Sequence, residues 1–391
     1  MLLYFAATMT EGDQAAISAD SDVYDVVIVG AGASGIGVAI AIQHAGIENY
    51  VVVDRDTVGA SFAAWPAETR FITPSFPSNS IGMLDLNSIG IGISPAFNMR
   101  IEHPTGQEFA SHLQSLAEFF ELPVLENTNI DGIEKVDDLF HLKTEDQTVH
   151  SRYVIWAAGE YQYPAMGHFD GAELCQHTST IERYGALEGD DFLIIGGYES
   201  GIDAAYHLAL NDKKVSVFDQ NCPWGAESSD PSIALSTYSF ERMRNQKFGD
   251  HVDLHPESRV QSISCDEGVY SLTTESGQVF HSNRQPILAN GFDGSHKFVS
   301  HLFEQRDDGF PSLNEKDEST IVPGMFLCGP SVRHDGHIFC FIFKYRQRFA
   351  VVAEAIASSL GFETEEFVEA YKSWGMYLDD LSCCGQECLT C

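Results

Sequence analysis

The stretch DVVIVGAGASGIGVAIAIQHAGIENYVVVD, residues 25–54, decides the fold of this chain. It opens with an apolar, β-branched run that is typical of a strand buried on both faces. The glycine turn Gly30–Gly35, an apolar helical segment and a second strand over residues 50–53 follow in order. Asp54 ends that strand, 24 residues after Gly30. This succession predicts a dinucleotide-binding Rossmann unit.

Each glycine of the turn has its own predicted task. Gly30 allows the tight turn, Gly32 lets the backbone approach a pyrophosphate, and Gly35 lets the helix pack on the strand. The free N–H groups and the dipole at the start of the helix then hold the phosphates, and Asp54 accepts hydrogen bonds from ribose hydroxyls. The alternative is a glycine turn in an unrelated α/β unit, which the ordered set of features disfavours.

A second unit of the same kind begins 166 residues later, counted from Gly30 to Gly196. A buried strand over residues 191–195 precedes the turn Gly196-Gly-Tyr-Glu-Ser-Gly201, and a helix and a strand ending at Asp219 follow. Tyr198 stands at the position of the second glycine, where its side chain should crowd a pyrophosphate. Either this unit is an altered nucleotide site, or it is a degenerate Rossmann half that only packs.

Three further strand-and-turn segments connect the two units. Residues 153–159 and 285–292 flank the second unit, and residues 324–330 precede a long helical stretch over about 341–360. The order predicts an α/β fold of two Rossmann-like domains, the second inserted into the first.

The composition limits the possible partners. The chain of 391 residues carries a formal net charge of -35, which repels nucleic acid and anionic lipid. No run reaches the roughly 18 apolar residues of a membrane helix, and no basic residue precedes the short apolar start. Nine cysteines without a secretory signal favour free thiols in a reducing cytoplasm. We therefore expect a cytoplasmic protein with an acidic surface and a small-molecule substrate, with no nucleic-acid or membrane partner, and the sequence leaves an oligomer open.

Five motifs carry a resemblance to a known family: GAGASGIG, ASFAAWPAETRFITPSF, IGGYESGIDAAYHLA, ILANGF and FIFKYRQRFAVVAEAI. From about Tyr24 onward the chain resembles the flavoproteins with two dinucleotide-binding domains. Within them it is most similar to the flavin-containing monooxygenases, in the bacterial branch that includes cation-efflux-associated flavoproteins. The resemblance implies FAD on the outer domain and NADPH or NADH on the inserted one. The expected segments are a flexible extension over 1–22, the FAD-binding domain over 23–165 and 286–375, the inserted NAD(P)H-binding domain over 166–285, and a Cys-rich tail over 376–391.

The resemblance also implies which residues bind the cofactors. Those expected at the FAD are Gly30, Gly32, Ser34 and Gly35 at the pyrophosphate, Asp54 at its ribose, Asn129 and Ile130 near the adenine, Ser61, Phe62 and Trp65 in a loop over the flavin, Arg70, Thr73 and Ser75 at its ring, and Gly329 beside the flavin. Further residues expected to bind a cofactor are Ala33, Arg55, Ala158, Gly159, Asn290, Gly291 and Pro330. Those expected at the nicotinamide cofactor are Gly196, Tyr198, Glu199, Ser200, Gly201 and Asp219.

The catalytic candidates are Trp65 and Arg70. In a monooxygenase, NAD(P)H reduces FAD, oxygen adds to the flavin, and a dry pocket protects the peroxyflavin until a soft nitrogen, sulfur or carbonyl centre attacks it. Trp65, Tyr161 and Tyr163 could wall such a pocket, although ordinary packing is the more common explanation for any one of them. Arg70 could stabilise a peroxide or hold the nicotinamide phosphates.

The chain departs from the family pattern at several positions. The second turn of these monooxygenases has the form G-x-G-N-S-G, so Tyr198 and Glu199 both differ. The F-x-G-x-x-x-H motif is found only loosely, with a displaced His177, and Pro330 replaces a common Asp. Asp219 favours a free ribose 2′-hydroxyl over a 2′-phosphate, and Lys213 and Lys214 lie at the wrong end of their strand to bind that phosphate, so both NADH and NADPH stay open.

The last residues, SCCGQECLTC, suggest an alternative function. Four thiols, Cys383, Cys384, Cys388 and Cys391, could bind Zn²⁺ or Cu⁺, or carry electrons as a dithiol in the way that the tail of mercuric reductase does by resemblance. A flavin-dependent disulfide or metal-ion reductase is thus the second hypothesis, and a non-catalytic flavin sensor or metal-binding partner is the third.

Other cysteines and histidines carry no predicted chemistry. We expect Cys328 and Cys340 to be buried as small hydrophobic side chains. His334 and His337 lack the further ligands of a metal site, and we expect them in a loop near the flavin.

Overall fold

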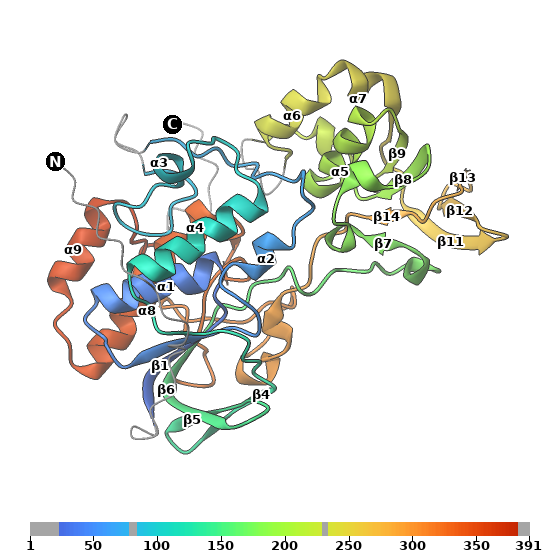
Figure 1. The fold of residues 1–391 in the computed structure, drawn as a ribbon. Helices are drawn as coiled ribbons and strands as arrows, with labels where there is room; N and C mark the ends of the chain where they lie inside the picture. The colour runs from blue at the N-terminus through green and yellow to red at the C-terminus, as the bar shows by residue number, and fades with distance from the viewer. Residues whose placement is uncertain (1–22, 78–83, 229–233, 382–391) are drawn as a thin grey trace.

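The computed structural model describes residues 23–77, 84–228 and 234–381, which form two lobes of the α/β class (Figure 1). The expected extension over 1–22 and the four cysteines of the tail lie outside these residues. Within the described part of the chain, no helix combines the length and the apolar character that crossing a bilayer requires.

The first lobe is built on a sheet whose central strands are parallel. Its order is β3-β2-β1-β6-β5-β4, and β15 also pairs with β6, in parallel. Val29 of β1 lies opposite Val53 of β2 and Trp156 of β6, so these three strands end at the same edge. The strands are β1 (Tyr24–Val29), β2 (Tyr50–Val53), β3 (Val124–Leu125), β4 (Gly132–Val136), β5 (Leu139–Lys143), β6 (Thr148–Trp156) and β15 (Met325–Leu327).

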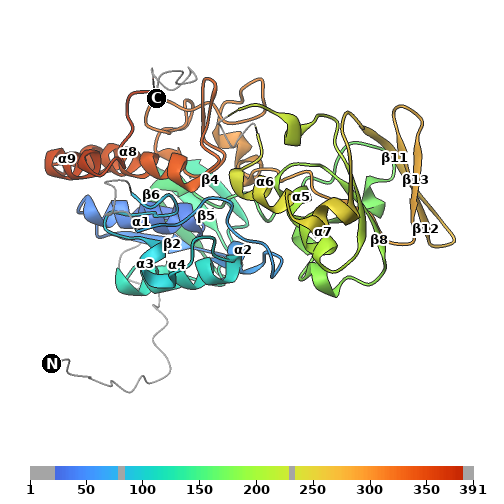
Figure 2. The ribbon, with the colours of Figure 1, turned by 90° about the horizontal axis from the view of Figure 1, so that it is seen from above.

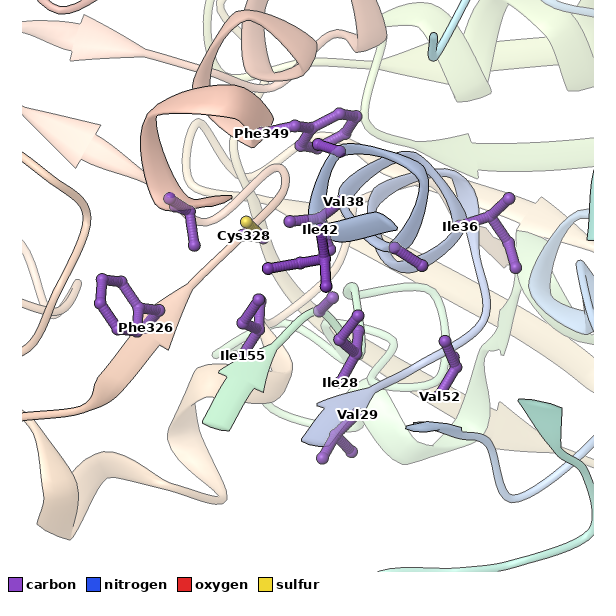
Figure 3. Packing of buried hydrophobic residues seen from close by; sticks show 14 of the residues in the cluster. Ile28, Val29, Ile36, Val38, Ile42, Val52, Ile155, Phe326, Cys328 and Phe349 are labelled. Carbon is purple, nitrogen blue, oxygen red and sulfur yellow. The ribbon is translucent and has the colours of Figure 1, made fainter. Parts of the chain in front are cut away.

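Helices α1 (Ala33–His44) and α8 (Ile342–Leu360) form the core of this lobe with the sheet. Figure 3 shows Ile28, Val52 and Ile155 of the strands on one side of α1 and Phe349 of α8 on the other. A Cβ at Gly37 would lie 2.2 Å from the Phe349 ring, so the two helices approach closely at this glycine. Figure 2 shows α9 continuing the α8 layer, and the remaining helices are α2 (Ala60–Ala63), α3 (Pro95–Met99), α4 (Gly106–Phe119) and α9 (Glu365–Ser373).

The second lobe repeats the parallel unit in a smaller sheet of order β10-β9-β8-β14-β7. Helix α5 (Glu199–Leu210) follows β8, as α1 follows β1. A separate antiparallel sheet joins β11, β12 and β13. The strands are β7 (Gln176–His177), β8 (Asp191–Ile195), β9 (Lys214–Phe218), β10 (Val252–His255), β11 (Val260–Asp266), β12 (Val269–Thr274), β13 (Val279–Ser282) and β14 (Ile287–Leu288), and the other helices are α6 (Thr237–Met243) and α7 (Gln246–His251).

The chain leaves the first sheet after β6 and returns to it at β15. The fold predicted from the two glycine turns is therefore confirmed: two Rossmann-like domains, the second inserted into the first. Strand β14 pairs with β8, so it belongs to the second sheet although it lies beyond residue 285. The predicted long helix is found as α8, and a short hairpin of β16 (Arg333–His334) and β17 (His337–Ile338) precedes it.

Candidate functional site

The first glycine turn has a backbone that only glycine satisfies at two positions. Gly30 has φ +107°, and a Cβ there would lie 2.5 Å from the Ala157 carbonyl oxygen. A Cβ at Gly35 would lie 1.7 Å from the Gly30 carbonyl oxygen. A Cβ at Gly32, in contrast, would meet no atom within 4 Å. Gly32 therefore faces open space at the N-terminus of α1, which suits a close approach by a phosphate.

Asp54, directly after β2, stabilises this turn through hydrogen bonds to its side chain. Its Oδ2 accepts a 2.6 Å hydrogen bond from the Ala31 amide, and its Oδ1 accepts one of 2.9 Å from the Asp56 amide. Burial raises the pKa of this carboxyl above its usual value, and the two amide bonds oppose that rise. The expected contact of Asp54 with a ribose stays a prediction, but its support of the turn is a role that the sequence did not indicate.

The second turn is built from the same parts. Gly196 has φ +101°, and a Cβ there would lie 2.5 Å from the Ala289 carbonyl oxygen. Asp219 accepts hydrogen bonds of 2.7 Å from the Gly197 amide and 2.8 Å from the Asn221 amide. Tyr198 has φ −85° and ψ −163°, close to the φ −82° and ψ −168° of Gly32. The second turn thus keeps the Rossmann backbone in spite of the tyrosine.

Side chains distinguish the second turn from the first. The Tyr198 hydroxyl donates a 2.9 Å hydrogen bond to the Ala234 carbonyl. Glu199 accepts 2.5 Å hydrogen bonds from the Ser236 amide and the Ser239 hydroxyl. These bonds tie residues 234–239, which we call the strap, to the N-terminal end of α5. Trp224 packs against the turn as well, because a Cβ at Gly197 would lie 2.3 Å from its ring.

One cavity of about 750 Å³ extends from the first turn to the start of α5. It includes most of the residues expected at the cofactors, and its wall is rich in aromatic rings. The expected residues that line it are Gly30, Gly32, Ala33, Ser34, Asp54, Arg55, Ser61, Phe62, Trp65, Arg70, Thr73, Asn129, Ile130, Ala158, Gly159, Tyr198, Glu199, Ser200 and Pro330, together with Tyr161 and Tyr163.

Eight expected residues do not line the cavity: Gly35, Ser75, Gly196, Gly201, Asp219, Asn290, Gly291 and Gly329. Several of them shape its wall from behind. Ser75 is buried and accepts a 2.8 Å hydrogen bond from Asn87. Gly329 has φ +107°, and a Cβ there would lie 2.6 Å from the Ser34 hydroxyl oxygen. The identities of Ser75 and Gly329 therefore reflect close packing behind the cavity wall.

The aromatic wall on the first lobe is a packed cluster. The Trp65 ring centre lies 5.3 Å from that of Phe62 and 5.1 Å from that of Phe71. The Tyr161 hydroxyl donates to the Ala64 carbonyl, and its ring centre lies 5.0 Å from that of Phe292. Burial raises the pKa of Tyr161 to about 12, so its hydroxyl keeps its proton at neutral pH. These packed rings give this part of the cavity wall an apolar surface.

Arg70 lies in the cavity wall at the junction of the lobes. Its Nη1 donates a 2.8 Å hydrogen bond to the His103 carbonyl and lies 3.9 Å from a Glu108 oxygen. About two-fifths of its side chain is exposed, at 41%. The guanidinium is therefore held by the His103 carbonyl while part of it stays exposed in the cavity wall, as an anion-binding residue requires.

A buried charge network between the lobes was not found from the sequence. Thr69 donates a 2.6 Å hydrogen bond to Asp203 of α5, and Asp203 forms an ion pair with Arg242 of α6. Although burial raises the pKa of Asp203, His207 and Arg242 lower it below its usual value overall. The network fixes the approach of α5 to the first lobe. No local sequence signal indicated it, because its members are separated in the chain.

Two further contacts hold the lobes together. The Glu68 carboxylate accepts hydrogen bonds of 3.1 Å from the Tyr184 and Gly185 amides. The Tyr238 ring stacks on His103, with 3.9 Å between the ring centres. The cavity is therefore bounded by two domains whose relative position is held by side-chain bonds.

One sequence expectation about a single residue is wrong. Cys328 is buried as expected, but the prediction for Cys340 is wrong, because Cys340 is half-buried and lines the cavity.

His334 and His337 face each other in the β16–β17 hairpin, and His334 lies 2.5 Å from Asp317. Among residues 23–77, 84–228 and 234–381, no His, Cys, Asp and Glu side chains gather in a metal-binding group. His177 bonds to the Gly291 carbonyl at 2.9 Å.

Sequence reasoning also missed Glu160, which lines the cavity directly after the expected Gly159. Its signal was available: an acidic residue follows the small-residue turn at the end of a buried strand. Arg242, Tyr345 and Cys340 also line the cavity.

The sequence of the chain matches a known protein family. The profile of the family described as "Pyridine nucleotide-disulphide oxidoreductase" matches residues 27–329. An alkyl hydroperoxide reductase protein of Staphylococcus epidermidis is 24% identical over 322 residues, which are 79% of this chain and 54% of that protein. The chain thus spans about half the length of this curated relative.

Two solved structures share the fold. The bacillithiol disulfide reductase Bdr of Staphylococcus aureus has a TM-score of 0.70 at 18% identity, covering 87% of this chain and 99% of its own. A flavin-containing monooxygenase from Stenotrophomonas maltophilia has a TM-score of 0.68 at 15% identity, covering 87% of this chain and 100% of its own. At these identities the likeness concerns the fold, and it includes both a disulfide reductase and a monooxygenase.

Proposed function

Because the chain belongs to the pyridine nucleotide-disulphide oxidoreductase family, we propose that it is an NAD(P)H-reduced flavoenzyme that oxygenates a soft nitrogen, sulfur or carbonyl centre. FAD and a nicotinamide cofactor are the cofactors of this family. The first turn fits FAD, since Gly32 opens onto the cavity. The second turn keeps the same backbone, with Tyr198 beside it. When bound, the flavin supplies the electron transfer and the reaction with oxygen.

The observation that carries the oxygenase proposal is the composition of the cavity wall. Aromatic rings line it on both lobes, among them Trp65 and Tyr198, and Cys340 is the only cysteine that reaches it among the described residues. Oxygenation needs a pocket that excludes water, which packed aromatic side chains provide. Dithiol chemistry needs a pair of neighbouring thiols, and residues 23–77, 84–228 and 234–381 place no such pair at the cavity.

The residues of the chain have separate tasks in this proposal. The first turn and the N-terminus of α1 bind the FAD pyrophosphate, while Ser200 at the start of α5 and Arg70 attract the phosphates of the reductant. Trp65 and Tyr161 keep water out. Tyr161 holds its proton, so it positions groups rather than exchanging protons.

Rapid mixing of the reduced, FAD-loaded protein with oxygen tests the proposal. We expect a transient absorbance band near about 370–380 nm before oxidised flavin returns, because the aromatic wall slows the loss of activated oxygen. Addition of a soft nucleophile should shorten the life of the band. Reoxidation in a single phase with release of one hydrogen peroxide per flavin would contradict it.

Cys340 favours a second candidate function, a flavin-dependent disulfide or metal-ion reductase. Its thiol lies in the cavity wall, where a disulfide substrate could reach it. The tail cysteines, which this candidate would also use, lie outside the described residues. Rapid reoxidation by a disulfide acceptor would support it if Cys340→Ser or the Cys383→Ser/Cys384→Ser pair removed that activity. Retention of the activity in both variants would exclude thiol chemistry by these residues.

A further inference from the structure

We propose that Glu160 is the proton carrier of the flavin cavity, taking up one proton when two electrons enter and releasing it when they leave. This inference deepens the proposed function, but it rests only on flavin binding at the first turn and not on oxygenation. It assigns a role to a residue that neither the motifs nor the resemblance had marked.

The position of Glu160 follows from the sheet. It lies four residues beyond Trp156, which ends β6 beside the carboxyl end of β1 that leads into the first glycine turn. Parallel strands place their functional groups at this edge. Gly159 has φ +66°, and the Tyr163 amide donates a 2.8 Å hydrogen bond to the Glu160 carbonyl. The backbone therefore reverses at Glu160, and the residue lines the same cavity as Gly30 and Ser34.

The surroundings of the carboxyl suit proton exchange. The side chain is half-buried, and it has no hydrogen-bond partner and no ion-pair partner within the described residues. Burial raises the pKa of Glu160, and the positive charge of Arg333 opposes this rise. A buried carboxyl whose pKa is raised exchanges protons at a pH closer to neutral than an exposed one does.

The charged and titratable groups that interact electrostatically with Glu160 include Arg333 and Tyr345. Arg333 is engaged elsewhere, since its Nη1 donates to the Pro330 and Val332 carbonyls and its guanidinium lies 4.2 Å from the Phe310 ring centre. Tyr345 of α8 has its pKa raised by burial and by the negative charge of Glu160. Cys340 and Tyr161 also line the cavity. Among these groups, Glu160 is the carboxyl whose pKa is raised by burial, and Arg333 is the cation that acts on it.

The reaction stoichiometry requires such a proton. Oxygenation consumes NAD(P)H, one proton, O₂ and substrate, and it yields NAD(P)⁺, water and the oxygenated product. Disulfide reduction consumes NAD(P)H, one proton and a disulfide, and it yields NAD(P)⁺ and two thiols. In both, the hydride brings two electrons and one proton, and solvent supplies the second proton. The added negative charge raises the proton affinity of Glu160, which takes up that proton and later passes it to the reduced acceptor.

The test is the pH dependence of the flavin midpoint potential, compared between the FAD-loaded wild type and Glu160→Gln. Each proton coupled to a two-electron reduction changes the potential by about 30 mV per pH unit. Between about pH 6 and 9, we expect the wild-type slope to be steeper than that of Glu160→Gln by up to this amount. Glu118→Gln, which alters an exposed carboxyl on α4, should keep the wild-type slope.

Two measurements keep the outcome decisive. If Glu160→Gln fails to bind FAD, proton uptake on photoreduction is measured with an indicator dye in the wild type and in Arg333→Gln. Because the charge of Arg333 lowers the pKa of Glu160, its removal should move the proton uptake to higher pH. Identical slopes in wild type and Glu160→Gln, or an uptake that Arg333→Gln leaves unmoved, would overturn the inference. A slope difference without the oxygen-dependent absorbance band would reject oxygenation alone, whereas the band without a slope difference would reject the role of Glu160 alone.

Discussion

Replacing Tyr198 by glycine should tighten the binding of NAD(P)H. The backbone of Tyr198 matches that of Gly32, where a Cβ points into open space. In the second turn, that space holds the tyrosine side chain, which reaches the Ala234 carbonyl. Tyr198→Gly therefore opens the N-terminus of α5 without requiring a new backbone conformation.

The expected gain can be worked out from the groups that become accessible. A hydrogen bond from an α5 amide to a pyrophosphate oxygen contributes about 1.5–3 kcal/mol, and the helix dipole adds about 0.3–1 kcal/mol. A gain near 2–3 kcal/mol corresponds to a dissociation constant about 30- to 150-fold lower. Loss of the packed ring should lower the thermal stability of the second lobe, whereas FAD binding at the first turn should stay unchanged.

Fluorescence titration of the FAD-loaded protein with NADPH and with NADH measures this change. Tyr198→Phe is the matched control: it removes the bond to Ala234, worth about 1 kcal/mol, but keeps the ring, so nucleotide affinity should change little. Unchanged or weaker binding in Tyr198→Gly would refute the crowding argument. It would show instead that the tyrosine is part of the nucleotide site.

Three further outcomes are expected. Gly32→Ala should fold, since its φ is −82°, but it should weaken FAD binding about 5- to 100-fold in a flavin-release assay, because its Cβ enters the cavity. Thr69→Val should lower the free energy of unfolding by about 1–3 kcal/mol in urea, because it leaves Asp203 without a bond from the first lobe. The pKa of Asp203 is held below its usual value by His207 and Arg242 against the effect of burial, so its stabilisation is complete above about pH 4 and is lost as the pH falls through the lower folded-state pKa. Acid unfolding of wild type and Asp203→Asn should show this difference, and parallel curves would contradict it.

The fold could be predicted because its determinants are local in the sequence. Gly30 and Gly196 adopt positive φ angles, and Gly35 and Gly201 lie too close to backbone carbonyls for any side chain. Because only glycine fits at these positions, the spacing of glycines after a β-branched run predicts the turn from the sequence alone. The insertion of one domain into the other followed from the order of the same local units.

Much of the site could not be predicted because its contacts join distant segments. The bond of Tyr198 to Ala234 spans 36 residues, and that of Thr69 to Asp203 spans 134. Cys340 was misjudged because a short loop has no periodicity that separates buried from lining positions. Glu160 is a different case, because its place after a small-residue turn was a local signal that the family motifs did not include.

The two turns bind with different strength if their side chains act as their positions indicate. At the first turn, Gly32 leaves the N-terminus of α1 open, and α1 has no acidic residue in its first turn. At the second, the Tyr198 ring occupies the open space, and Glu199 places a negative charge in the first turn of α5, which opposes an anion there. Each 1.4 kcal/mol lost from binding raises the dissociation constant tenfold. A cofactor that stays through many cycles benefits from the first arrangement, whereas a reductant that must leave after each hydride transfer benefits from the second.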